Sequence, residues 1–437
     1  MSRAAWKMIV LASLGGTLEY YDFVIFGIFA REIGQAVFPS QDPLVSLMVA
    51  FTTFAIGYIA RPVGGLVLGR LGDKFGRRGV FLAAIFVTSA ATLGIGIVPT
   101  YAQWGIAASL LVVLLRITQG FCLGGELPGA VTYVAESAGD AAPFACGVIY
   151  TFVTLGVALG TGISLVVSKM MDPAFAAVYG WRIAFIFGGL TGLGSFLLRR
   201  SFEESPAFLE LKRLAAASRE PVGELLRTHP AQIVVGIAAQ AATACFAGLF
   251  FAHMPAYLTA VAKYDAPTAV FAQTSAVLVH AVVILAIGWL ADRYSPHQLL
   301  RIGSLLMLLG GYPFYAALSA HSANILLLMI LASIAGAFVN GTFAFVTADL
   351  FPTRIRFSGV ALVQNISQTA FGGTAPLVAT ALIRSLQSPV APALVVGVCG
   401  VMTFASSFGF ARYTGKAGNE GTRQVGDVVI VPSPPVP

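Results

Sequence analysis

The chain has 437 residues, of which 57% are hydrophobic and 10% are charged. A soluble domain has about 25% charged residues, so the composition excludes an ordinary soluble protein. The net charge of +7 does not indicate a nucleic-acid partner, because basic residues also set the orientation of membrane proteins.

Apolar stretches long enough to cross a lipid bilayer recur along the chain. A transmembrane helix needs about 20 mostly apolar residues, and each stretch here ends at a short polar or Gly/Pro-rich break. The sequence therefore predicts an all-α membrane protein with twelve transmembrane helices. The predicted spans are 8–36, 44–69, 79–98, 103–135, 143–168, 180–198, 230–260, 267–291, 299–318, 323–348, 357–383 and 390–411.

The first span begins like a secretory signal peptide, since Arg3 and Lys7 precede an apolar run. The run is too long for a signal peptide and lacks a small-residue cleavage site. It also contains two acids, Glu19 and Asp22. We therefore predict an uncleaved first helix.

Basic residues fall mainly on one side of this predicted topology. If the N-terminus is cytoplasmic, nineteen Lys and Arg residues lie on the cytoplasmic side and four lie outside, namely Lys169, Arg182, Lys263 and Arg384. Basic residues favour the cytoplasmic side, and an even number of spans brings both ends of the chain to the same side. We predict a multi-pass protein of the bacterial inner (cytoplasmic) membrane with both termini in the cytoplasm.

The two halves of the chain share an internal repeat. The sequence GRLGDKFGRR from Gly69 is matched by GWLADRYSPH from Gly288, and both the glycine and the aspartate are offset by 219 residues. The predicted parts are an N-terminal six-helix bundle (1–198), a cytoplasmic linker (199–229), a C-terminal six-helix bundle (230–412) and a disordered cytoplasmic tail (413–437).

The repeated loop and four further motifs resemble one group of transporters. Parallel six-helix repeats are typical of secondary transporters, and GRLGDKFGRR resembles the signature loop of the major facilitator superfamily. EYYDF in the first span, RPVGG from Arg61, RITQGFCLGGE from Arg116 and FPTRIRFSGVALVQNISQTAFGGTAP from Phe351 resemble the metabolite:H+ symporter family. That family includes bacterial α-ketoglutarate, citrate, shikimate and proline/betaine permeases. The resemblance implies the major facilitator fold and alternating access.

The loop after the second span is predicted to gate the cytoplasmic side. Its glycines allow two helix ends to approach closely, and its aspartate can face the positive end of a neighbouring helix. The alternative is that its basic residues only fix the topology beside anionic lipid. The gating residues predicted from this motif are Gly69, Gly72, Asp73, Gly76 and Arg77, with Asp292 as the second-half equivalent of Asp73.

The two acids of the first span lie near its middle. At 1.5 Å per residue, Glu19 and Asp22 lie roughly 17 and 21 Å along a helix that begins near Met8, within an apolar layer about 30 Å thick. Their spacing of three puts both acids on one helix face. A charged group at that depth costs about 2.5 to 3.5 kcal/mol, so we expect both acids to face protein or water and to have a partner.

Arg116 is the predicted partner of these acids. The fourth span runs inward and puts Arg116 roughly 20 Å from the outer face, at a similar depth. An anionic substrate that engages the arginine would release a carboxyl group to take a proton. This arrangement predicts proton coupling through Glu19 and Asp22. The alternative is a static lock of acids and arginine between the first and fourth helices.

Further polar residues complete the predicted site. Arg61 is a second candidate for substrate binding, because relatives that carry dicarboxylates use an arginine in this context; alternatively it extends to the cytoplasmic interface. Gln119 lies on about the same face as Arg116 and is assigned to substrate binding, as is Asn365 of the second half. Gating roles are predicted for Glu126, Glu136, Asp349, Arg354 and Arg356.

The predicted C-terminal half has no charged residue at mid-membrane. We expect coupling to reside in the N-terminal half and substrate shape to be recognised partly by neutral groups of the second half. His253 and His280 can titrate near neutral pH, although a lone buried histidine is more often structural. The polar groups at depth are Gln240, His253, Gln273, His280, Asn340, Asn365 and Gln368.

The cytoplasmic gate departs from the family's pattern. The loop after Glu136 reads SAGDAAPFACG and lacks the usual arginine, and the second latch ends in SPH. We therefore expect the gate either to close weakly or to use other pairs, such as Arg354 or Arg356 with an acid of the N-terminal half. Pro128 also predicts a kink just after Glu126.

Together these patterns predict a proton-coupled symporter that takes up a small organic acid or zwitterion. The four cysteines have no paired spacing, and the sequence contains no phosphate-binding loop or catalytic cluster, so we expect no cofactor, no metal and no enzymatic activity. The expected partners are a small-molecule substrate, protons and the lipid bilayer, without nucleic acid, and the expected functional unit is a monomer. Two alternatives remain, a proton-driven exporter of the same fold and a non-transporting sensor.

Overall fold

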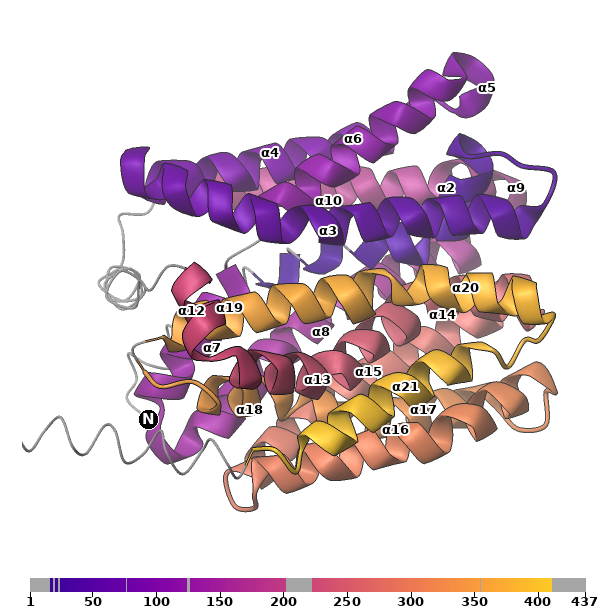
Figure 1. Ribbon diagram of the computed structural model, residues 1–437. Helices are drawn as coiled ribbons and strands as arrows, with labels where there is room; N and C mark the ends of the chain where they lie inside the picture. The colour runs from indigo at the N-terminus through magenta and orange to yellow at the C-terminus, as the bar shows by residue number, and fades with distance from the viewer. Residues whose placement is uncertain are drawn as a thin grey trace, which may run out of the picture.

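The computed structural model describes residues 16–18, 20–22, 24–75, 77–123, 126–201, 222–353 and 355–410. Within these ranges every regular element is a helix, as expected where lipid offers the backbone no hydrogen-bond partners. The helices run side by side in one elongated bundle (Figure 1). Glu19, Gly76 and Arg354 lie outside the described residues, as do most of the predicted linker and nearly all of the predicted tail.

The N-terminal half, residues 16–201, begins with the helical segment that carries Asp22. Figure 1 shows α3, α4 and α6 along the top of the bundle. The helices of this half are α2 (Ala30–Val37), α3 (Pro43–Phe75), α4 (Arg77–Ile97), α5 (Tyr101–Trp104), α6 (Ile106–Cys122), α7 (Glu126–Ser137), η1 (Gly139–Ala141), α8 (Ala142–Met170), α9 (Pro173–Phe175), η2 (Ala176–Gly180) and α10 (Trp181–Ser201).

The C-terminal half, residues 222–410, contains three π-helical turns, labelled η3, η4 and η5. Such turns are rare and often occur at functional sites. The helices of this half are α12 (Val222–Thr228), α13 (Pro230–Phe246), η3 (Ala247–His253), α14 (Met254–Ala256), η4 (Tyr257–Val261), α15 (Ala266–Ala291), α16 (Pro296–Ser319), α17 (Ile325–Asn340), α18 (Phe343–Asp349), α19 (Arg356–Ser367), η5 (Gln368–Gly373), α20 (Ala375–Leu386) and α21 (Pro392–Ser406).

The helices follow the predicted spans closely. Nine helical stretches of the described chain are long and apolar enough to cross a membrane, and two shorter apolar helices cover Leu82–Ile97 and Pro392–Ser406. The segment before α2, together with α2, covers the described part of the first span. Each of the twelve predicted spans therefore has a helical counterpart.

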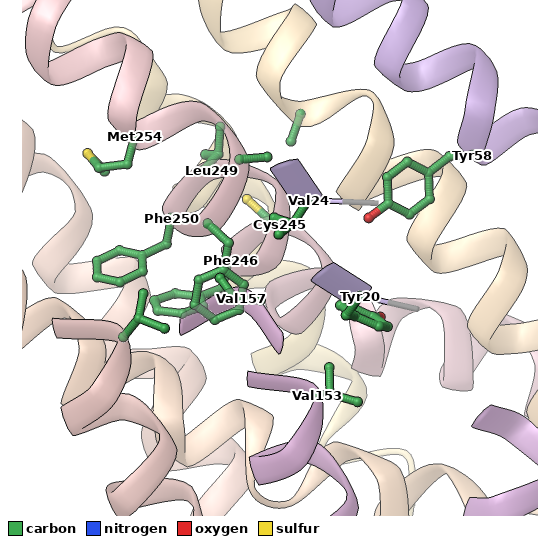
Figure 2. Close-up of a cluster of buried hydrophobic side chains, with 14 of the residues drawn as sticks. Tyr20, Val24, Tyr58, Val153, Val157, Cys245, Phe246, Leu249, Phe250 and Met254 are labelled. Carbon is green, nitrogen blue, oxygen red and sulfur yellow. The ribbon is translucent and has the colours of Figure 1, made fainter. Parts of the chain in front are cut away.

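Contacts between the halves occur at both ends of the bundle. We call the end with the α3–α4 and α15–α16 connections the basic end, because Arg293 and Arg301 lie there; it is the left end in Figure 1. At the other end, Nε of Arg384 lies 3.1 Å from Oδ2 of Asp42. Between the ends, apolar side chains of both halves pack together (Figure 2). They include Tyr20, Val24, Val153 and Val157 from the first half and Phe246, Leu249 and Phe250 from the second.

Candidate functional site

The carboxyl group of Asp22 is buried between its own helix and helices α4 and α10. Asp22 is 5% exposed. A Cβ atom added at Gly188 of α10 would lie 2.6 Å from Oδ1 of Asp22, so a glycine is needed there to make room for the carboxyl group. Thr92 of α4 lies beside the same carboxyl group, because the Cβ atom added at Gly188 would also lie 3.3 Å from Cγ2 of Thr92. Asp22 is therefore enclosed within the N-terminal half.

Arg116 is fully buried on α6 and is linked through Gln119 to Thr92, the neighbour of Asp22. Nη1 of Arg116 donates to Oε1 of Gln119 at 3.0 Å, and Nε2 of Gln119 donates to Oγ1 of Thr92 at 2.7 Å. The guanidinium carbon of Arg116 also lies 4.5 Å from the ring centre of Phe26. The structure thus brings together three of the predicted residues, and adds Thr92, which the sequence alone does not indicate.

Arg61 lies at a close crossing of α3 and α6. A Cβ atom added at Gly64 or Gly120 would collide with a backbone carbonyl of the facing helix, so these glycines let the helices touch. Arg61 is 5% exposed, and its guanidinium carbon lies 4.5 Å from the ring centre of Tyr58. The side chain is therefore inside the bundle, and it lies close enough to Arg116 for the two charges to interact.

On the C-terminal side, Gln364 is one of the side chains that join the two halves. Its Nε2 donates to the hydroxyl group of Tyr150 at 2.9 Å, and the ring of Tyr150 lies 4.5 Å from that of Phe343. Asn365, the predicted substrate residue, follows directly in the chain and donates to the Ala361 carbonyl of its own helix at 3.0 Å. The run of amides in VQNISQ signals this region but does not show which amide faces the other half.

His280 has hydrogen-bond partners on both ring nitrogens. Its Nδ1 lies 2.7 Å from the Ser333 carbonyl oxygen, and its Nε2 lies 2.9 Å from Nδ2 of Asn340. A carbonyl oxygen only accepts and an amide nitrogen only donates, so a neutral imidazole with its hydrogen on Nδ1 fits both. The geometry supports the structural interpretation of His280.

We expect His280→Leu to lower the free energy of unfolding by about 1 to 3 kcal/mol, because two buried polar groups lose their partner. Thermal unfolding of the purified protein measures this effect. The double variant with Asn340→Leu should lose less than the sum of the single changes, since the unpaired amide is then absent. A His280→Leu protein that folds normally but loses the coupling of transport to protons would contradict a structural role.

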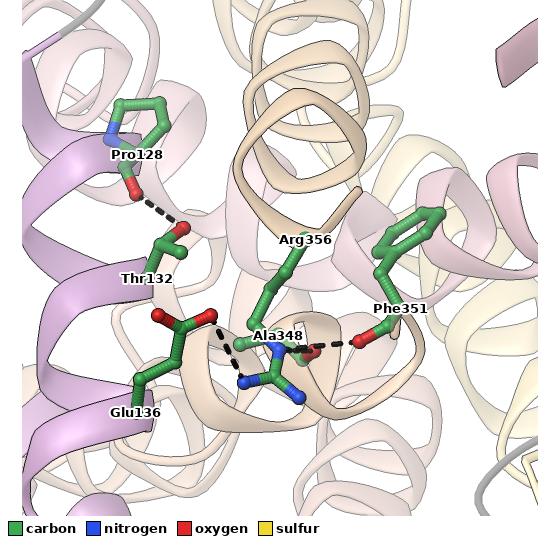
Figure 3. A network of polar contacts seen from close by, with 6 residues as sticks. All are labelled: Pro128, Thr132, Glu136, Ala348, Phe351 and Arg356. Atoms are coloured by element: carbon green, nitrogen blue, oxygen red, sulfur yellow. Dashed lines mark hydrogen bonds and ion pairs between the residues drawn. The ribbon is translucent and has the colours of Figure 1, made fainter. Parts of the chain in front are cut away.

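At the basic end, Arg356 joins α19 to α7 of the other half (Figure 3). Its Nε donates to the carbonyl oxygens of Ala348 and Phe351 at 3.0 and 3.1 Å, at and just after the end of α18. Its Nη1 lies 3.3 Å from Oε1 of Glu136. An acid of the N-terminal half thus pairs with a base of the C-terminal half.

Two further predicted gating acids also have partners at the basic end. Oδ1 of Asp292 accepts a hydrogen bond from the backbone N–H of Phe144 at 2.8 Å. This N–H lies in the first turn of α8, so Asp292 caps the positive end of a helix in the other half. Burial raises the pKa of Asp292, and the Phe144 N–H acts in the opposite direction. Asp349 pairs within its own half, 3.7 Å from Nε2 of His297.

The first latch is described only in its backbone. Gly69 and Gly72 lie within α3, Arg77 begins α4 and Glu126 begins α7. The side chains of Asp73, Arg77 and Glu126 lie outside the described part of the chain. Their gating roles stay predictions.

The sequence matches known membrane transporters over most of its length. Residues 12–376 match the family model described as Major Facilitator Superfamily. The chain is 32% identical over 412 residues to the glycine betaine/proline/ectoine/pipecolic acid transporter OusA of Dickeya dadantii, covering 91% of this chain and 82% of that protein. It is 31% identical to the proline/betaine transporter of Salmonella typhimurium, with the same coverage.

Solved structures show the same fold. The proton:xylose symporter XylE bound to 6-bromo-6-deoxy-D-glucose has a TM-score of 0.73 and 16% identity, covering 94% of this chain and 96% of that chain. A partially occluded inward-open XylE from E. coli has a TM-score of 0.72 and 16% identity, with 94% and 98% covered. The relatives in sequence are transporters and not enzymes. This chain belongs to the Major Facilitator Superfamily of membrane transporters.

Proposed function

We propose that this protein is a proton-coupled symporter of the bacterial inner membrane that takes up a small zwitterionic or carboxylate metabolite. The observation that carries the proposal is the burial of Asp22 and Arg116 in one polar cluster within one half of the bundle. Charged side chains inside a membrane are costly, and they mark ion and substrate pathways. Both termini are proposed to be cytoplasmic, and the functional unit is proposed to be a monomer.

Arg116 and Arg61 supply the positive charge that a substrate carboxylate needs. Both are buried and close to each other, so an anionic group between them reduces their repulsion. Once a carboxylate occupies Arg116, the arginine attracts the ionised form of Asp22 less, and Asp22 takes up a proton. Proton and substrate then cross together. The names of the relatives, which include proline and betaine transporters, favour a zwitterion as the substrate.

Alternating access requires the contacts at the two ends to break in turn. The Glu136–Arg356 pair and the Asp292 cap hold the basic end together, and the Asp42–Arg384 pair holds the other end. Opening toward the cytoplasm breaks the first set, and opening outward breaks the second. Each end is held by only one or two polar contacts, so breaking them costs little free energy and both open states can be reached.

Uptake into proteoliposomes under an imposed inward proton gradient tests the proposal. The panel contains glycine betaine, proline, α-ketoglutarate and citrate, with empty liposomes as the control. The proposal predicts accumulation of a zwitterion that collapses when a protonophore is added. Loss of preloaded compound as protons enter would indicate an exporter, and binding without movement in either direction would indicate a sensor.

We expect Glu136→Gln to open the basic end more often. The pair with Arg356 is half-buried, and loss of such a contact costs about 1 kcal/mol, which is about a fivefold shift of a two-state equilibrium. The rate of labelling of a cysteine at Phe144, which faces Gly288 across the interface, should rise accordingly in a variant without the four native cysteines. Glu136→Gln combined with Arg356→Gln should quicken labelling no further. An unchanged labelling rate in both variants would remove Glu136 from the gate.

A further inference from the structure

His253 is a buried histidine that has no task in the proposed transport cycle. It belongs to the π-helical turn η3 and is fully buried. Its Nε2 lies 3.1 Å from Oγ1 of Thr380 on α20. The Thr380 hydroxyl donates its hydrogen to the Pro376 carbonyl oxygen at 2.8 Å, so Nε2 must carry a hydrogen and donate it. Nδ1 is then an acceptor, and it has no hydrogen-bond partner among the described residues.

The N-terminal half also covers this histidine. The ring of Phe51 on α3 lies 5.3 Å from the imidazole ring. The preceding residue, Ala252, lies so close to the first helix that a Cβ atom added at Gly27 would collide with it. The turn η3 thus meets two helices of the other half, and residues of both halves enclose His253.

This enclosure lies toward the end of the bundle that is held by the Asp42–Arg384 pair. We call it the outer end, because the proposed topology places it outside. Thr380 precedes Arg384 by one turn of α20. When the two halves separate at the outer end, Phe51 moves away from the imidazole and water can reach the ring.

We propose that His253 is a second proton-binding site, which binds a proton from outside only while the outer end is open. In the open state, the lone pair of Nδ1 takes a proton from the outside water and forms an N–H bond. An imidazolium has two N–H donors, and the closed state offers a partner to only one of them. A buried charge with an unpaired donor is very costly, so the closed state excludes the protonated form.

The proton on His253 must return to the outside water before the halves close, so it is not carried inward with the substrate. Acid outside therefore favours the outward-open state, in which the protein receives substrate. The inference rests on the proposed function, because it assumes that the protein alternates between outward-open and inward-open states.

Among the described residues, no charged side chain interacts with the imidazole. The ring of Tyr257 in η4 lies 5.9 Å from it, and the Tyr257 hydroxyl donates to the Pro389 carbonyl at 2.9 Å. Protonation of His253 is therefore governed by burial and not by a charged neighbour. The described groups on the surrounding elements that are charged or can titrate near neutral pH are Asp22, Arg31, Glu32, Arg61, His280 and Arg384.

The test is the distance between the two halves at the outer end, measured by pulsed EPR in lipid nanodiscs without substrate. Spin labels are attached to cysteines at Gln41 and Ser385, two exposed positions in opposite halves, in a variant without the four native cysteines. An imidazole in water has a pKa of about 6.5. The ratio of outward-open to closed protein should therefore rise by up to about 30-fold from about pH 8 to about pH 5.

His253→Gln keeps a donor for Thr380 but cannot take up a proton, so the ratio should change by less than about threefold over the same range. His321→Asn is the matched control, because His321 is an exposed histidine at the same end of the bundle. Its φ of 50° suits asparagine, and this variant should keep the full response to pH.

His253→Phe keeps an aromatic ring beside Phe51 and serves as the test if His253→Gln does not fold. A full response in the variant that folds, or no response in the protein with His253, would overturn the inference. Asp22→Asn should keep the response; if it abolishes the response, Asp22 senses the pH and the inference fails. Uptake into proteoliposomes tests the proposed function separately, because the distance measurement needs neither substrate nor a proton gradient.

Discussion

Asp22→Asn should abolish proton-driven accumulation while leaving substrate exchange across the membrane. An amide keeps the size and hydrogen bonds of a protonated carboxyl group but cannot release a proton. The variant is held in the state that binds substrate, so accumulation should fall at least about 100-fold, whereas exchange should stay within about threefold of the wild type. Parallel uptake and counterflow measurements in proteoliposomes separate the two activities.

Asp172→Asn provides the matched control for this change. Asp172 is an exposed acid that accepts hydrogen bonds from the backbone of the short helix α9, and it lies far along the chain from the buried site. The same substitution there should leave accumulation unchanged. Gradient-driven accumulation by Asp22→Asn at the wild-type level would show that the proton is carried elsewhere, with Glu19 as the next candidate.

Arg116→Gln should remove nearly all substrate uptake and exchange. The guanidinium group is fully buried, and it holds Gln119 and lies over Phe26. Loss of one member of a buried charge arrangement costs about 3 to 5 kcal/mol, which corresponds to a loss of more than about 100-fold in kcat/KM. Because the substrate carboxylate also loses its partner, binding should fail together with transport.

Arg116→Lys distinguishes a binding role from a purely structural one. Lysine keeps the charge but loses the planar fork of donors, so we expect an increase of about tenfold in KM with a smaller change in kcat. The exposed Arg293, which stacks on Trp289 at 3.6 Å, is the control site. If Arg116→Lys lowers the melting temperature strongly but leaves the KM of the folded fraction unchanged, Arg116 is a static lock between helices.

The fold could be predicted from the sequence because lipid restricts the choice so strongly. Apolar length, the bias of basic residues and the repeat of the Gly69 and Gly288 loops give the number of helices without any knowledge of their packing. The π-helical turns that interrupt some of the spans could not be predicted. A π-helical turn such as η3 follows from local packing, and the even hydrophobicity of α13 around it carries no periodic signal.

The sequence could predict how deep in the membrane the site residues lie, but not which way their helix faces point. Depth along the first and fourth spans is enough to bring Asp22 and Arg116 to one level. Which face a residue occupies depends on how the helices pack, and adjacent positions differ by about 100°. For that reason the sequence does not show that Gln364, next to the predicted Asn365, reaches Tyr150 of the other half. It also gives no sign of Thr92, a hydroxyl on a third helix.

Of the contacts at the basic end, the sequence could predict one but not another. The loss of an arginine after Glu136 suggested that Arg354 or Arg356 would meet an acid of the first half, and the structure places Arg356 against Glu136. The partner of Asp292 is a backbone N–H of α8. Pro143 marks the start of α8, but nothing in the sequence shows that an acid of the other half reaches this helix end, so only the packing of the two halves reveals this contact.

The most direct test of proton-coupled uptake is the pH inside proteoliposomes, followed with an entrapped dye after substrate is added outside without any imposed pH gradient. If substrate carries protons inward, the lumen of wild-type vesicles acidifies and that of Asp22→Asn vesicles does not. Alkalinisation of the wild-type lumen, or substrate entry with no change in pH, would contradict the account.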